Sequence, residues 1–111
     1  MPNLAKAVSP TSDAAMRYNR LKAEWIGHLA TLADTGATTD VFTDETTSNW
    51  WQTAANVVAP DGTKLAFMLL CRWMRTTGRT HTTAGCYKNG KAITQAAFHA
   101  GLDTMLAQAS K

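Results

Sequence analysis

The stretch Leu65–Met74, which reads LAFMLLCRWM, decides the fold that the sequence predicts. Nine of its ten residues are apolar, and Arg72 carries the only charge. Because the stretch is rich in leucine and methionine and has no β-branched residue, its composition favours a helix over a strand. A helix that is apolar on nearly every face has to be covered on nearly every face. The sequence therefore predicts a central core helix over about 63–75.

The length of this apolar stretch also bears on the membrane. It is about half of the roughly 20 residues that a membrane-spanning helix needs, so we expect no membrane contact. The first residues, MPNLAKAVSP, contain no apolar block of the kind found in secretory signals. We therefore expect a cytoplasmic protein, with 1–10 as a flexible arm and 11–111 as one domain.

The apolar spacing elsewhere predicts more helices. Apolar residues recur every three or four positions between Asp13 and Ala33, and again between Thr94 and Ala109. A further helix is expected over 49–59, ended by Pro60. The threonine-rich segments 35–47 and 76–85 are predicted to be loops, with a short extended piece as an alternative within 35–47. The Asn89-Gly90 pair also allows a short β-hairpin over 86–93. The predicted fold is mainly α, a compact bundle of about four helices around the central one.

Charge is distributed unevenly along the chain. No Lys or Arg occurs between Lys22 and Lys64, an interval that contains six acidic residues. From Lys64 to Lys91 there are six basic residues and no acidic one. Such asymmetry influences partners and association rates more than it influences the fold.

The basic stretch 72–91 leads to the main functional hypothesis. Its cations and aromatic residues are the groups that contact phosphates and stack on bases. We expect a small non-enzymatic regulatory or inhibitory binding module that docks on nucleic acid, on a nucleoprotein or on an acidic protein partner. The residues expected to make the contacts are Arg75, Arg79, His81, Tyr87, Lys88 and Lys91, with Tyr87 stacking.

Two alternatives belong to other functional classes. In the first, the protein is a protein–protein adaptor or a homodimer, in which the acidic segment 34–45 of one chain meets the basic segment of another. Adjacent helical residues point about 100° apart, so one of Trp50 and Trp51 is the expected partner anchor. The second alternative is an enzyme that uses Cys86, with His81 as the nearest base. No cofactor motif or close-paired metal ligands support it, so we expect no cofactor and no metal.

Overall fold

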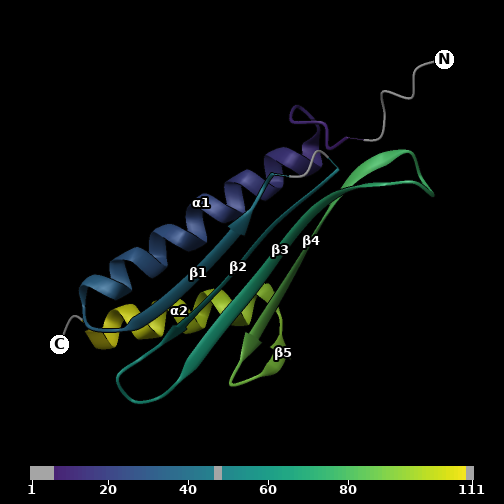
Figure 1. Cartoon of the computed structure of the whole chain (residues 1–111). Helices are drawn as coiled ribbons and strands as arrows, with labels where there is room; N and C mark the ends of the chain where they lie inside the picture. The colour runs from purple at the N-terminus through teal and green to yellow at the C-terminus, as the bar shows by residue number, and fades with distance from the viewer. Residues whose placement is uncertain (1–6, 47–48, 110–111) are drawn as a thin grey trace.

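In the computed structural model, residues 7–46 and 49–109 form one antiparallel five-stranded sheet flanked by two helices (Figure 1). The strand order is β1-β2-β3-β4-β5, so each strand pairs with its neighbours in the sequence. In chain order, the elements are α1 (Asp13–Asp34), β1 (Thr38–Asp44), β2 (Trp50–Val58), β3 (Lys64–Met74), β4 (Arg79–Lys88), β5 (Lys91–Ile93) and α2 (Gln95–Ala109).

The prediction of a mainly α bundle, and with it the description of the protein as helical, is therefore wrong. Leu65–Met74 lies in β3, the centre of the sheet, where it pairs with β2 on one side and β4 on the other. Alternate residues of β3 are buried beneath the helices, and the residues between them lie on the opposite face. Because both sets are apolar, the strand has no alternating pattern that would distinguish it from a buried helix. The pairing of three strands overrides the weak helical propensity of leucine and methionine.

The other differences follow from the same sheet. The predicted helix over 49–59 contains strand β2, and the predicted loops 35–47 and 76–85 contain all of β1 and most of β4. In a strand, consecutive side chains point to opposite faces. Trp51 therefore packs against Tyr18 of α1, with ring centroids 5.9 Å apart, while Trp50 lies on the face away from the helices and is 39% exposed.

The structure confirms the two terminal helices and the short hairpin. Helix α1 begins after Ser12, whose hydroxyl accepts a hydrogen bond from the Ala15 amide. Helix α2 begins after Thr94, whose hydroxyl accepts from the Ala97 amide. Asn89 and Gly90 both have positive φ, 50° and 85°, as the tight turn between β4 and β5 requires.

Both helices pack on the same face of the sheet, and the core lies between them and the strands. Trp25 of α1 is central, with ring centroids 5.0 Å from Phe67 of β3 and 5.0 Å from Phe98 of α2. Gly101 lets α2 approach β3 closely, since a Cβ there would lie 2.9 Å from Leu65. We call this side of the sheet the covered face.

Two further expectations concern the N-terminal arm and the membrane. Residues 1–6 of the expected arm lie outside the described residues, and Val8 is buried in the core. Over the part of the chain that the structure describes, no helix has the length and apolar character needed to cross a membrane.

Candidate binding surface

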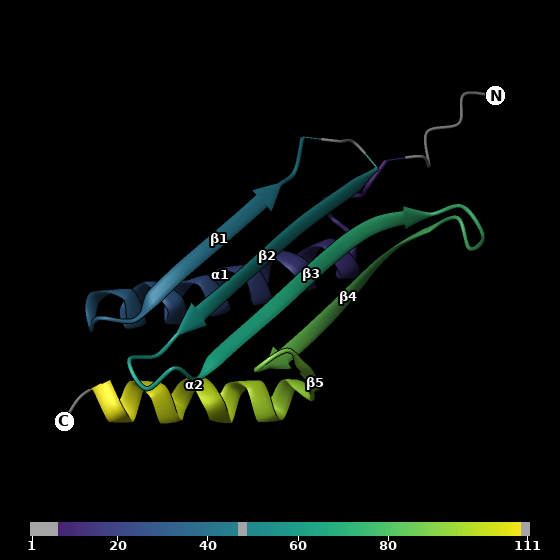
Figure 2. The ribbon, with the colours of Figure 1, turned by 60° about the horizontal axis from the view of Figure 1, so that its bottom comes forward.

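The side of the sheet opposite the helices is the candidate site. Across residues 7–46 and 49–109 no element packs over it, and Figure 2 shows its strands in front of α1. We call it the open face and define it by the residues of β1 to β4 that alternate with those on the covered face. They are Thr38, Asp40, Phe42, Asp44, Trp50, Gln52, Ala54, Asn56, Val58, Lys64, Ala66, Met68, Leu70, Arg72, Met74, Arg79, His81, Thr83, Gly85 and Tyr87.

The centre of the open face is apolar. The strand register places Phe42, Ala54, Met68 and Gly85 in one row across β1 to β4. Phe42 is 54% exposed and Met68 is 49% exposed. The Tyr87 side chain lies over Gly85, because a Cβ on that glycine would be 3.0 Å from the Tyr87 hydroxyl. Between the large side chains is a hollow of about 340 Å³, lined by Asp40, Phe42, Ala54, Asn56, Ala66, Met68 and Tyr87 among others.

The margins of the open face carry opposite charges. Asp40 and Asp44 lie on β1, at one edge of the sheet, whereas the cations lie on β3 and β4. These cations are Lys64, Arg72 and Arg79. The uneven charge of the sequence is thus also uneven in space, with acidic and basic groups on different strands of one face.

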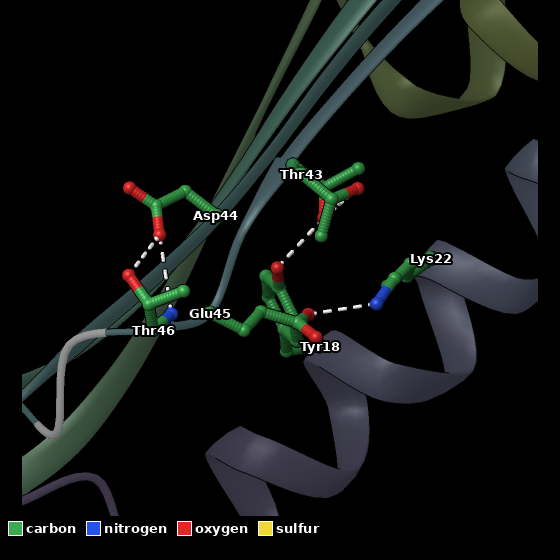
Figure 3. Close-up of polar contacts among 7 residues, drawn as sticks. Tyr18, Lys22, Thr43, Asp44, Glu45 and Thr46 are labelled. Carbon is green, nitrogen blue, oxygen red and sulfur yellow. Dashed lines mark hydrogen bonds and ion pairs between the residues drawn. The ribbon is translucent and has the colours of Figure 1, made fainter.

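The neighbouring carboxylates of Asp44 and Glu45 point to opposite sides of the sheet. The hydroxyl and the amide of Thr46 donate to Asp44 Oδ1 at 2.7 and 3.1 Å, and these bonds lower the pKa of Asp44 (Figure 3). The next residue, Glu45, points to the other side and pairs with Lys22 of α1 at 2.7 Å. Asp44 therefore stays ionised on the open face, while Glu45 ties β1 to the helix.

The residues predicted from the sequence to make contacts are divided between the two ends of β4. Arg79 and His81 lie near the β3–β4 connection, which also holds Arg75. Lys88 and Lys91 pair across the Asn89-Gly90 turn at the other end. Nine residues of strand place Lys88 about 30 Å from Arg79. Lys88 is also opposite the buried Leu65, so it lies on the side of the helices.

One row near the β3–β4 connection does combine aromatic and basic groups. The register aligns Trp50, Arg72 and His81 across β2, β3 and β4. His81 Nε2 lies 2.8 Å from the Thr77 hydroxyl. Tyr87, the residue expected to stack, lies three rows away over the apolar centre.

The surroundings of Cys86 do not favour a nucleophile. Its side chain is 3% exposed on the covered face, and burial raises the pKa of its thiol to about 11. A reactive cysteine needs the opposite, a lowered pKa and access to substrate. His81 lies on the other face of the same strand. Among the described residues, no three His, Cys, Asp or Glu side chains are grouped to hold a metal ion.

Sequence reasoning missed the apolar centre of this surface. Phe42 was expected in a loop and Met68 inside a helix, so neither was a site candidate. The threonines of this segment together with Val41 and Phe42, all residues common in strands, were the available signal of a strand. No protein-family model, no curated protein and no solved structure matches the chain, so its function is inferred from the surface itself.

Proposed function

We propose that this protein is a non-enzymatic interaction module that docks a protein partner on the open face of its sheet. The observation that carries the proposal is the group of large, exposed apolar side chains, Phe42, Met68 and Tyr87, around a hollow that Ala54 and Ala66 also line. Contiguous apolar surface of this kind is typical of protein-binding sites. Aromatic and methionine side chains are also enriched in the centres of interfaces.

The charges around the apolar centre favour a protein over a nucleic acid. Asp40 and Asp44 flank Phe42 on the same strand and the same face, where their carboxylates would repel a phosphate backbone. A protein partner instead offers cations to these carboxylates and apolar side chains to the hollow. The regulatory or inhibitory role and the cytoplasmic location expected from the sequence remain predictions.

Site-specific photo-crosslinking in cells tests this proposal. A photoreactive phenylalanine analogue replaces Phe42 on the open face or, as a control, Met16, which is 59% exposed on α1. We expect discrete protein adducts from position 42 and none of the same mass from position 16. The absence of any discrete protein adduct at position 42, in cells that express the protein natively, would overturn the proposal.

Nucleic-acid binding is a second candidate, favoured by the row of Trp50, Arg72 and His81 with Arg79 beside it. Aromatic and basic groups on an open sheet face can stack bases and neutralise phosphates. The test is the anisotropy of labelled single-stranded RNA and duplex DNA at two salt concentrations. Binding should weaken steeply with salt and be lost in Arg72→Glu/Arg79→Glu. The control variant Lys88→Glu, about 30 Å from Arg79, should retain it.

A further inference from the structure

We infer that the partner of the open face is a second copy of this chain, packed face to face about a two-fold axis parallel to the strands. The inference rests on the proposed function, since it names the protein that the open face binds. It follows from the register of β1 to β4, which fixes the side chains that such an axis brings together.

The central row of the open face pairs unlike positions with its own reverse. Across β1 to β4 it reads Phe42, Ala54, Met68 and Gly85, and the Tyr87 side chain of the next row lies over Gly85. An axis parallel to the strands places β1 over β4 of the other copy and β2 over β3. Phe42 then faces the partner's Tyr87 ring above Gly85, and Met68 faces the partner's Ala54, and the same contacts recur in the other direction. A large residue opposite a small one, as in the second contact, is what interdigitating layers need.

The in-plane two-fold axis perpendicular to the strands gives a poor match. An axis through this row and across the strands places every strand over itself. Phe42 would then meet Phe42 and Met68 would meet Met68, while Ala54 would leave a gap between the sheets. Overpacking and voids both weaken an interface. The pattern of sizes therefore selects the axis parallel to the strands.

The charges select the same axis. It places the acidic β1 edge of each copy over the basic β3–β4 half of the other. The position directly opposite Asp44 is one strand and one residue row away from the partner's Arg72. The position opposite Asp40 has the same offset from the partner's Lys64. Neighbouring strands are about 4.8 Å apart and neighbouring rows about 7 Å apart, which is within reach of long basic side chains. The axis across the strands would instead place the acidic strand of each copy over that of the other.

The size of the open face indicates a weak dimer. Four strands at about 4.8 Å spacing, each contributing about eight residues of rise, make a face of roughly 500 Å² per copy. Specific interfaces usually bury about 800 Å² per partner. We therefore expect a dissociation constant in the micromolar range and a monomer–dimer equilibrium that depends on protein concentration.

Two charge-reversal variants test the inference. Sedimentation equilibrium of the full chain measures their dimerisation. One variant, Asp40→Lys/Asp44→Lys, reverses the acidic edge, and the other, Lys64→Glu/Arg72→Glu, reverses the facing cations. Each variant alone should dimerise at least about tenfold more weakly than the natural chain, because like charges then face each other in both halves of the interface. An equimolar mixture of the two should form a heterodimer, since every reversed charge then meets its opposite.

The outcomes separate this inference from the proposed function. A concentration-dependent dimer, weakened in each variant and restored in the mixture, supports the two-fold arrangement. A natural chain that stays monomeric at concentrations well above micromolar overturns it, as does a mixture that stays monomeric. The proposed function survives that result if photo-crosslinking at position 42 gives a protein adduct of a mass other than twice that of the chain. A matched variant on α1, Arg20→Glu, should leave the equilibrium unchanged.

Discussion

The two faces of the sheet have different roles, because one holds the core and the other is exposed to solvent. Leu69 and Met68 are neighbours in β3, yet Leu69 is fully buried beneath the helices and Met68 is 49% exposed on the other side. The covered face holds nearly all of the core, and burial of apolar area there is the main source of stability. The open face leaves comparable side chains in water, where they contribute little to folding. Apolar surface retained without a folding role is available for binding.

The two faces also treat polar groups differently. On the covered face, Thr53 is fully buried and its hydroxyl lies 2.7 Å from that of Tyr18. The Trp25 indole donates to His99 Nε2 at 2.9 Å. Buried polar groups need such partners, because an unpaired one loses its hydration without compensation. On the open face, the carboxylates and guanidinium groups stay near water, which can hydrate them.

The largest expected difference between the faces comes from truncating these two neighbours. Leu69→Ala should lower the free energy of unfolding by about 2–5 kcal/mol, because it leaves a cavity between the sheet and the helices. Met68→Ala should change it by less than about 1 kcal/mol, since the side chain is half exposed. Urea unfolding of both variants measures the comparison. Equal losses of stability would show that something covers the open face in the isolated protein.

Local signals in the sequence predict the ends of the fold well. The periodic apolar residues of α1 and α2, the Ser12 and Thr94 caps and the Asn89-Gly90 turn all act within a few residues, so their structures follow from short stretches. The middle of the chain is different. LAFMLLCRWM has no alternation because both faces of β3 are apolar, and its composition resembles that of a helix. Its strand conformation comes from pairing with β2 and β4, which no local pattern reveals.

The grouping of residues in the candidate site could not be predicted from local sequence patterns either. The basic residues were visible in the sequence, but whether they share a surface depends on cross-strand register. Arg79 and Lys88 are both cations of β4, and the length and alternation of that strand place them far apart and on different faces. Phe42 and Met68 are 26 positions apart in the sequence and lie in one row of the open face. A sequence read as helices and loops cannot bring such residues together.

A smaller effect is expected from the buried hydroxyl pair of the covered face. Thr53→Val keeps the shape of the side chain but removes the partner of the Tyr18 hydroxyl, which should lower stability by about 1–2 kcal/mol. Tyr18→Phe removes the other member of the pair. The double variant should be more stable than the sum of the two single effects predicts, because no buried hydroxyl is then left unpaired. Strictly additive losses in thermal or urea unfolding would contradict this coupling.

An effect of similar size is a dependence of stability on alkaline pH that arises on the covered face. Burial raises the pKa of the Cys86 thiol to about 11, so the folded protein keeps the proton over a range in which the unfolded chain releases it. The stabilising contribution of this group is complete below about pH 9 and is lost as the pH rises through the folded pKa, with a difference of about 1.4 kcal/mol at pH 10. Cys86→Ala should therefore flatten the fall of unfolding free energy between about pH 9 and pH 11. Tyr18, whose pKa burial also raises, remains in both proteins and contributes equally to both curves. Parallel curves for the natural chain and Cys86→Ala would mean that the thiol meets water in the folded state, and that β4 is less tightly covered by α2 than the buried position of Cys86 requires.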